Sequence, residues 1–291
     1  MSNYDAILIT GPTASGKSAL ALRLAREADA VVINADSMQV YDTLRVVTAR
    51  PSEAEMEDVE HRLYGHVPAT TTYSTGQWLR AAANEVARAR RLGKLPLFVG
   101  GTGLYFKALT GGLSEMPDVP EDVRIRYRDR LAEEGAEVLH HELSVRDPAG
   151  ASTLKPGDGQ RIVRALEVLE ASGKPISFFQ AQSGPRIIDP DRALKQVVLP
   201  DRALLRARIN RRFETMMDDG AIDEVRALLA QSPSPDVPAM KAIGVPQIAA
   251  MLTGDLTRDE VIEQSSAATR QYAKRQMTWF RNQMDATWER V

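Results

Sequence analysis

The feature that most constrains this chain is a glycine-rich segment near its start. Residues 11–18 read GPTASGKS and match the pattern G-x-x-x-x-G-K-[ST], directly after the apolar run 6–9 and before an amphipathic helical pattern. A strand before the segment and a helix after it are the context that this pattern requires. In that context, successive backbone N–H groups and the positive end of the helix form an anion site. The sequence therefore predicts a loop that binds a phosphorylated ligand.

Two side chains of this loop carry chemistry of their own. Lys17 supplies a mobile positive charge, and Ser18 is a candidate ligand for Mg²⁺. The loop leaves the reaction open, because the same cradle serves NTP hydrolases, kinases and transferases that release pyrophosphate. The residues predicted to contact phosphate are Gly11, Thr13, Ala14, Ser15, Gly16, Lys17 and Ser18.

Composition limits the class of protein. The chain has 291 residues, of which 43% are hydrophobic and 26% charged, which suffices for one large core or for one core and a satellite domain. The absence of cysteine excludes disulfides, thiolate metal sites and a cysteine nucleophile. The start lacks a basic segment, and no apolar run approaches the ~20 residues of a membrane span, so we expect a cytoplasmic protein. The net charge of −2 means that any nucleic-acid binding depends on local basic patches.

Strand-like and helical patterns alternate along the chain. Apolar runs at 6–9, 31–34, 97–100 and 194–199 are separated by helical patterns. This alternation predicts an α/β fold, in which a P-loop NTPase-like parallel sheet is flanked by helices.

A helical stretch interrupts this alternation. Residues 121–143 and 159–172 are helix-periodic, and no strand candidate lies between them. We expect residues 116–193 to form a helical insertion domain that leaves the carboxyl edge of the sheet, where ligands bind in open α/β folds. Residues 1–115 and 194–291 then form the two parts of the core domain. The second part is expected to hold helices within 202–231, at 245–252 and at 258–282, and a closing strand at 287–291.

A carboxylate follows the second predicted strand. Asp36 comes directly after the run 31–34, so it is expected to face the phosphate loop at the carboxyl edge of the sheet. It could hold Mg²⁺ through water, accept a substrate proton as a general base, or cap the next helix. The third strand runs into a loop in which Gly100, Gly101 and Gly103 surround Thr102. Such a loop lets backbone or a ligand approach closely, or it serves packing alone.

Three basic segments are candidate anion-binding sites. Arg161 and Arg164 share a helix face and could grip a phosphate backbone, or they could form a solvated face. Arg208 and Arg212 also share a face and could clamp a pyrophosphate. Residues 271–281 interleave basic and aromatic side chains, which suits nucleic acid or an amphipathic helix that buries its aromatics in the core.

Taken together, the segments resemble one family over essentially the whole chain. GPTASGKS, INADSMQVY, GGTGLY, DGQRIVRALEV, MKAIGV and QYAKRQMTWFR occur in this order. This set is similar to that of the bacterial tRNA dimethylallyltransferases, also called tRNA isopentenyltransferases. The resemblance implies transfer of a dimethylallyl group from dimethylallyl diphosphate to N6 of the adenosine immediately 3′ of the anticodon in tRNA. Mg²⁺ would assist, and pyrophosphate would leave.

The resemblance also implies roles for particular residues. Asp36 would be the general base and Thr102 its partner, and Arg208 or Arg212 would stabilise the departing pyrophosphate, which makes these four the candidate catalytic residues. The loop residues 11–18 would bind the diphosphate, with Ser18 on the metal. The tRNA anticodon stem-loop would be held by a monomeric protein. The residues implied to contact tRNA are Asp36, Ser37, Met38, Gln39, Arg124, Gln160, Arg161, Ile162, Val163, Arg164, Lys241, Lys274, Arg275 and Arg281.

The chain departs from the family pattern at two places. Val245 stands where the family usually has tyrosine, and the stretch after Tyr41 lacks the usual glycine but keeps Thr48 and Arg50. Two other classes remain open from the residues alone. A small-molecule kinase would bind ATP, and Asp36 would then activate a substrate hydroxyl. A non-catalytic RNA-binding NTPase would show nucleotide-dependent RNA affinity and no covalent product.

Overall fold

The computed structural model describes residues 4–182 and 184–291. The chain divides into two compact units, of which the first comprises Met1–Thr110 and Arg186–Val291 and the second Gly111–Pro185. Within the described residues, no helix combines the length and the apolar character that a membrane crossing requires.

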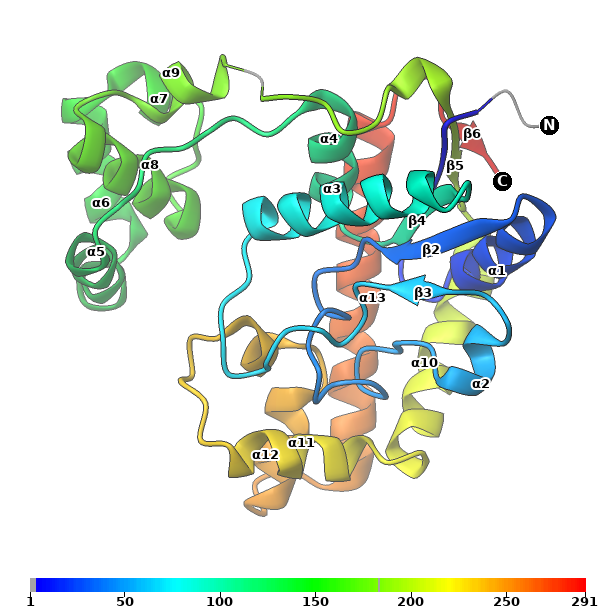
Figure 1. Ribbon diagram of the computed structural model, residues 1–291. Helices are drawn as coiled ribbons and strands as arrows, with labels where there is room; N and C mark the ends of the chain where they lie inside the picture. The colour runs from blue at the N-terminus through cyan, green and yellow to red at the C-terminus, as the bar shows by residue number, and fades with distance from the viewer. Residues whose placement is uncertain (1–3, 183) are drawn as a thin grey trace. The chain divides into compact units, whose positions relative to one another are not determined.

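The first unit is built on a parallel sheet with the strand order β3-β2-β4-β1-β5-β6 (Figure 1). The α/β prediction is confirmed, and the four predicted central strands are all present. The structure adds β3, whose two residues are too short to give a sequence pattern. The strands are β1 (Ala6–Thr10), β2 (Ala30–Asn34), β3 (His61–Arg62), β4 (Leu95–Gly100), β5 (Ala193–Val197) and β6 (Glu289–Arg290).

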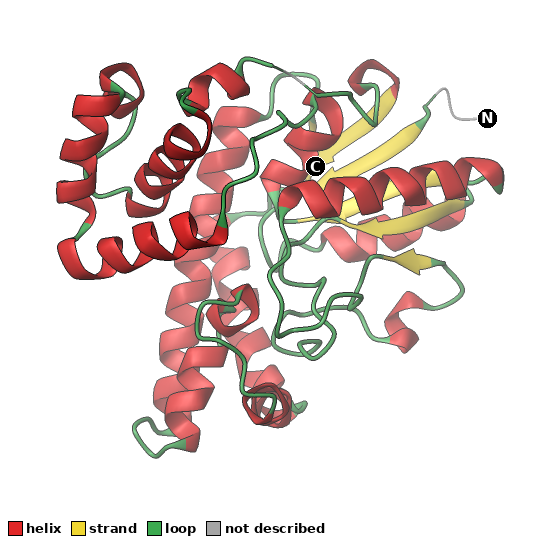
Figure 2. Cartoon of the chain, turned by 60° about the vertical axis from the view of Figure 1, so that its left-hand side comes forward, coloured by secondary structure: helices red, strands yellow, loops and turns green. Residues whose placement is uncertain are grey.

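Helices cover both faces of this sheet (Figure 2). Side chains of a strand alternate between its faces, so Ile7 and Ile9 of β1 pack with α1 (Lys17–Glu27), while Ala6 and Leu8 lie in the core on the other side. The second face is covered by α3 (Thr75–Arg91) and α4 (Gly103–Gly111). A short helix, α2 (Glu53–Met56), precedes β3. Because β2, β4 and β1 are parallel neighbours, their carboxyl ends meet at one edge of the sheet.

The chain after β5 is helical until β6. The predicted break at Gly220 is present. This glycine has a left-handed conformation and separates the first two helices of this part of the chain. Leu205, Ile209 and Ala273 form a small buried cluster where the first and last helices pack together. The elements are α10 (Arg202–Asp218), α11 (Ala221–Ala230), η2 (Pro238–Lys241), α12 (Val245–Leu252) and α13 (Arg258–Gln283), while η1 (Pro190–Arg192) precedes β5.

The second unit is a small helical bundle with its own core. The single helix predicted at 121–143 is wrong, because Gly135 has a φ of 84° and divides it into two. A left-handed residue cannot continue an α-helix. Tyr127, Leu139 and Ile162 are fully buried in the core of this unit. The helices are α5 (Glu121–Glu134), α6 (Ala136–Arg146), α7 (Pro148–Ser152), α8 (Gly159–Ser172) and α9 (Ile176–Gln180).

Candidate active site

The phosphate loop joins β1 to α1 through two left-handed residues. Ala14 has a φ of 62° and Gly16 a φ of 96°, which turns the chain into the first turn of α1. A methyl group at Gly11 would lie 2.6 Å from the carbonyl oxygen of Val198, so only glycine fits beside the end of β5. The loop is therefore shaped to place backbone N–H groups at the positive end of α1.

The ammonium group of Lys17 has a lowered pKa, which a bound anion would raise. Its Nζ donates a hydrogen bond to the carbonyl oxygen of Pro12 at 3.2 Å. Burial lowers the pKa of Lys17 to about 8, the nearby Asp36 carboxylate opposes this shift, and the Arg212 guanidinium adds to it. A bound phosphate would raise the pKa again by supplying negative charge.

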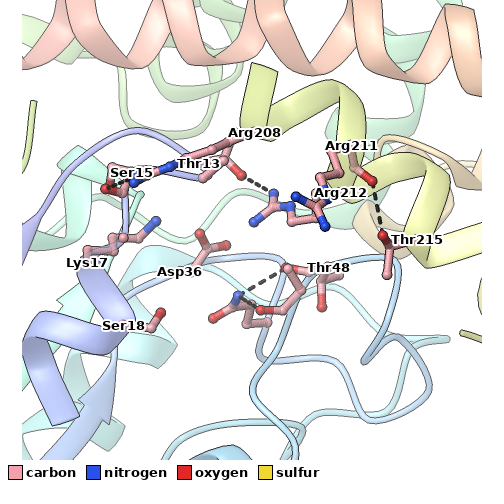
Figure 3. Close-up of a pocket in the computed structure, with 14 residues that line it drawn as sticks. Thr13, Ser15, Lys17, Ser18, Asp36, Thr48, Arg208, Arg211, Arg212 and Thr215 are labelled. Atoms are coloured by element: carbon pink, nitrogen blue, oxygen red, sulfur yellow. Dashed lines mark hydrogen bonds between the residues drawn. The ribbon is translucent and has the colours of Figure 1, made fainter. Parts of the chain in front are cut away.

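A cavity of about 500 Å³ opens beside this loop (Figure 3). It is lined by the basic side chains of Lys17, Arg208, Arg211 and Arg212, and Asp36 is the one acidic lining residue among those that the structure describes. Such an excess of positive charge fits a ligand with several negative charges. The pairing of Arg208 and Arg212 on one helix face, predicted from their spacing, is present in this cavity.

Both arginines contact the phosphate loop. Arg208 Nη1 donates to the carbonyl oxygen of Ser15 at 3.2 Å, and Arg212 Nη2 donates to Thr13 Oγ1. The first turn of α1 also presents the exposed hydroxyl of Ser18 to the cavity. The loop and α10 thus form opposite walls of one anion site.

Asp36 is held at the end of β2 by local hydrogen bonds. Its backbone N–H donates to Asn34 Oδ1 at 2.9 Å, and Asn34 Nδ2 donates to its carbonyl oxygen at 3.0 Å. The carboxylate Oδ1 accepts the Met38 N–H at 3.0 Å. The helix-cap interpretation of Asp36 is wrong, because the next helix is α2 and Ser52 caps it. Asp36 therefore lies where a base or a metal-associated carboxylate could act.

The glycine loop after β4 packs closely at each of its glycines. A methyl group at Gly100 would meet the Ala35 backbone at 2.1 Å, one at Gly103 would meet the Trp279 ring at 2.2 Å, and one at Gly101 would lie 3.2 Å from Asp36 Oδ2. The close approach of backbone at this loop is therefore confirmed, and the approach of a ligand stays a prediction.

Thr102 acts on the segment that follows Asp36. Its Oγ1 accepts the Ser37 N–H at 2.9 Å and donates to Ser37 Oγ at 3.2 Å. Thr102 is not among the residues that line the two cavities of the site. In this conformation it positions the turn that carries Asp36.

A second cavity of about 340 Å³ adjoins the first. The two cavities share Thr13, Asp36, Thr48 and Arg212. Its lining is mixed, with Lys241 and Arg275 beside an apolar wall that suits a hydrocarbon chain or a flat base. This wall includes Met38, Val47, Ile209, Phe213, Met216 and Tyr272.

The residues implied to contact RNA fall into separate places within the first unit. Ser37, Met38, Lys241 and Arg275 line the second cavity, and Gln39 lines the first. Gln39 Nε2 donates to the carbonyl oxygens of Thr48 and Ala49 and so holds the loop that lines both cavities.

Lys274 and Arg281 lie elsewhere on α13. They line a groove of about 400 Å³ between α10 and α13. Phe280 is buried in the core, whereas Trp279 is half-buried and packs on Gly103. Val245 is also fully buried.

The second unit carries the remaining candidates at the start of α8 and on α5. Gln160 and Arg161 are exposed, whereas Arg164 pairs with Glu167 at 3.3 Å. Arg124 on α5 pairs with Glu121 at 3.6 Å. The side chains of Ile162 and Val163 are buried in the core, so only their backbone could reach a ligand.

Two buried polar residues that contact the site loops escaped the sequence analysis. Asn34 and Gln276 are buried polar side chains that bridge backbone atoms of the site loops. Neither has a spacing that marks it, because each stands singly in a strand or helix whose other residues follow the ordinary pattern. The one signal in the sequence that could have identified them is a polar residue at a position where the strand or helix pattern faces the core.

The fold and this site define a P-loop protein whose ligand carries several phosphate charges and an apolar part. The sequence matches the family described as "IPP transferase" over residues 39–283 and the one described as "Isopentenyl transferase" over residues 4–69. It is 70% identical to a tRNA dimethylallyltransferase of Allorhizobium ampelinum, over 99% of this chain and 95% of that protein. It is 66% identical to one of Rhizobium meliloti, again over 99% and 95%. The chain therefore belongs to the tRNA dimethylallyltransferase family, and it is a transferase.

Solved structures agree with this family. The full-length tRNA isopentenylpyrophosphate transferase of Bacillus halodurans is 31% identical with a TM-score of 0.69, over 99% of this chain and 89% of that one. A eukaryotic dimethylallyltransferase acting on tRNA is 27% identical with a TM-score of 0.79, over 94% of this chain and 69% of that one. The resemblance drawn from the six sequence segments is thus confirmed.

Proposed function

We propose that the protein transfers a dimethylallyl group from dimethylallyl diphosphate to N6 of the adenosine 3′-adjacent to the anticodon in tRNA. The observation that carries the proposal is the junction of the two cavities at Asp36. A cavity rich in positive charge suits the diphosphate, and the apolar wall of the adjoining cavity suits the five-carbon chain and the target adenine. Because that adenine is stacked in the anticodon loop, it must be extruded to reach the junction.

The transfer breaks one bond and forms another. The bond between the allylic carbon and the diphosphate oxygen breaks, the carbon–N6 bond forms, and the N6 proton passes to the Asp36 carboxylate. The exocyclic amine is a weak nucleophile, so removal of its proton lowers the barrier. Charge develops on the departing pyrophosphate, where Lys17, Arg208 and Arg212 stabilise it. Thr102 keeps the Asp36 turn in place through Ser37.

The residues present fit a magnesium ion. Ser18 offers a hydroxyl on the diphosphate cavity, and Mg²⁺ prefers oxygen ligands that include substrate phosphates and retained waters. The buried Ser15 hydroxyl has no hydrogen-bond partner among the described residues, which leaves a further oxygen beside the loop. Bound there, Mg²⁺ would supply positive charge to the diphosphate oxygens.

The partners follow from the same reaction. We propose that the tRNA anticodon stem-loop is gripped by the exposed basic residues of α8 and of α13, and that the protein acts as a monomer in the cytoplasm.

Mass spectrometry tests the proposed function directly. The protein is incubated with unmodified tRNA, dimethylallyl diphosphate and Mg²⁺, and the digested nucleosides are examined. We expect one five-carbon adduct on the adenosine that follows the anticodon, and none when the diphosphate is replaced by ATP. Phosphate transfer from ATP, or no adduct with either donor, would overturn the proposal.

A further inference from the structure

Gln276 on α13 has a buried side-chain amide, although the two residues before it are exposed. Its side chain is 6% exposed, whereas Lys274 and Arg275 lie at the surface. A buried amide costs free energy unless both its oxygen and its nitrogen have hydrogen-bond partners. Its two partners therefore explain why a polar residue stands at this position.

Each half of the Gln276 amide holds a different loop of the site. Oε1 accepts the backbone N–H of Thr13 at 2.9 Å, and Nε2 donates to the carbonyl oxygen of Gly101 at 2.9 Å. Thr13 belongs to the phosphate loop, and Gly101 belongs to the glycine loop after β4. The two loops are far apart in the sequence, and this one side chain bridges them.

The two loops hold opposite reactants of the proposed transfer. Thr13 lines both cavities and its hydroxyl accepts from Arg212, so its position affects the diphosphate. Gly101 lies against Asp36, since a methyl group on it would be 3.2 Å from Asp36 Oδ2. The bridge thus fixes the separation between the leaving group and the base.

The local packing depends on this bridge. A methyl group at Gly101 would lie 2.4 Å from Gln276 Nε2, which is too close for any other residue at position 101 while the amide stays in place. The amide and the glycine are matched in shape as well as in hydrogen bonding.

We infer that Gln276 is a positioning residue for the transfer, because it sets the register of the phosphate loop against the loop that supports Asp36. This inference rests on the proposed function. A misplacement of about 1 Å between reacting groups can cost on the order of 10²-fold in rate. Loss of the bridge should therefore lower kcat far more than it raises the KM for dimethylallyl diphosphate.

Two substitutions separate this role from simple packing. Gln276→Met keeps the length and removes both hydrogen bonds, so we expect kcat to fall by about 10²-fold while the KM for the diphosphate changes only a few-fold. In Gln276→Glu, a protonated carboxyl group can accept from Thr13 and donate to Gly101, as the amide does, whereas the ionised form cannot donate. The kcat of this variant relative to wild type should rise as the pH falls through the pKa of the new carboxyl group.

Gln283 on the same helix gives the matched control. It is exposed and accepts from Lys107 at 3.5 Å, so Gln283→Met and Gln283→Glu should match wild type at every pH. A Gln276→Met variant with wild-type kcat would overturn the inference, as would a Gln276→Glu variant whose relative kcat does not change with pH. The second result remains decisive if Gln276→Met fails to fold. A wild-type protein that forms no adduct would instead refute the proposed function.

Discussion

At the scale of single residues, the site depends on a few side chains that hydrogen bonds with nearby residues hold in place. Asp36 is fixed by Asn34 and by the Met38 N–H, while Lys17 is held in a half-buried position beside it. In the proposed reaction, Asp36 is a carboxylate that accepts a proton, and Lys17 is an amine whose charge depends on the ligand. Their chemistry can be tested separately.

Asp36→Asn tests the general base. An amide keeps the oxygen that accepts the Met38 N–H, so the turn should hold its shape, but it cannot accept the N6 proton. We expect transfer to fall by about 10²- to 10⁴-fold, with diphosphate and tRNA affinity within a few-fold of wild type. Single-turnover kinetics and calorimetry measure the two effects. A collapse of diphosphate affinity would make Asp36 a metal-site residue instead.

Proton uptake tests the state of Lys17. With a pKa of about 8 in the empty site, Lys17 is largely protonated below pH 7 and about half neutral at pH 8. A bound diphosphate raises this pKa, so binding should take up about half a proton at pH 8 and little at pH 6.5. Calorimetry of dimethylallyl diphosphate in buffers of different ionisation enthalpy measures the uptake. Protons exchanged by the diphosphate itself are common to both proteins, so the uptake of wild type minus that of Lys17→Arg should be about half a proton at pH 8 and small at pH 6.5. Equal uptake in both proteins would contradict the assignment.

At the scale of elements, the site depends on how closely loops approach α13. Gly103 at the start of α4 packs on Trp279, and Gly101 packs on Gln276, one turn earlier on the same helix. Helix α13 therefore sets the position of the glycine loop, which in turn lies against Asp36. Trp279 is half-buried and packs against the core of the first unit.

Gly103→Ala tests that approach. The new methyl group would lie 2.2 Å from the Trp279 ring, and such overpacking should lower the free energy of unfolding by about 1–3 kcal/mol. Thermal denaturation followed by tryptophan fluorescence measures the change. Gly111→Ala at the other end of α4 meets nothing within 4 Å, so it should be neutral or slightly stabilising. Equal stability of the two variants would mean that the loop does not need its glycine.

At the scale of the whole molecule, charge is sorted although the net charge is only −2. In the first unit, Lys17 and three arginines face one cavity, while Lys274 and Arg281 line a groove elsewhere. In the second unit, α8 begins with the exposed Arg161. RNA binding should therefore rest on a few local phosphate contacts and weaken with salt.

Arg161→Ala tests such a contact on the second unit. Each neutralised phosphate contributes roughly 0.7 to 0.9 to the slope of log K against log salt, so this variant should flatten the slope by about that amount. Arg164→Ala should also lower the melting temperature, because it removes the partner of the buried Glu167. Arg23→Ala on α1, an exposed residue paired with Glu27, is the control. An unchanged slope in Arg161→Ala would mean that Arg161 forms a solvated face.

The sequence by itself determined the local elements and the loop chemistry. The strand before GPTASGKS, the helix after it and the carboxylate after β2 follow from apolar periodicity and residue type, which act over a few neighbours. The pairing of Arg208 with Arg212 follows from helix geometry in the same way. Six segments in order then identified the family.

Only the tertiary structure decided which of these residues work together. Gln276 bridges Thr13 and Gly101 across 263 and 175 positions of sequence, and no local pattern records a contact of that range. The break at Gly135 and the burial of Ile162, Val163 and Phe280 were also decided by packing, because a helical period identifies a face without saying what covers it. Distances across a sheet edge depend on how whole elements pack, so the junction of the two cavities at Asp36 appears only in the folded chain.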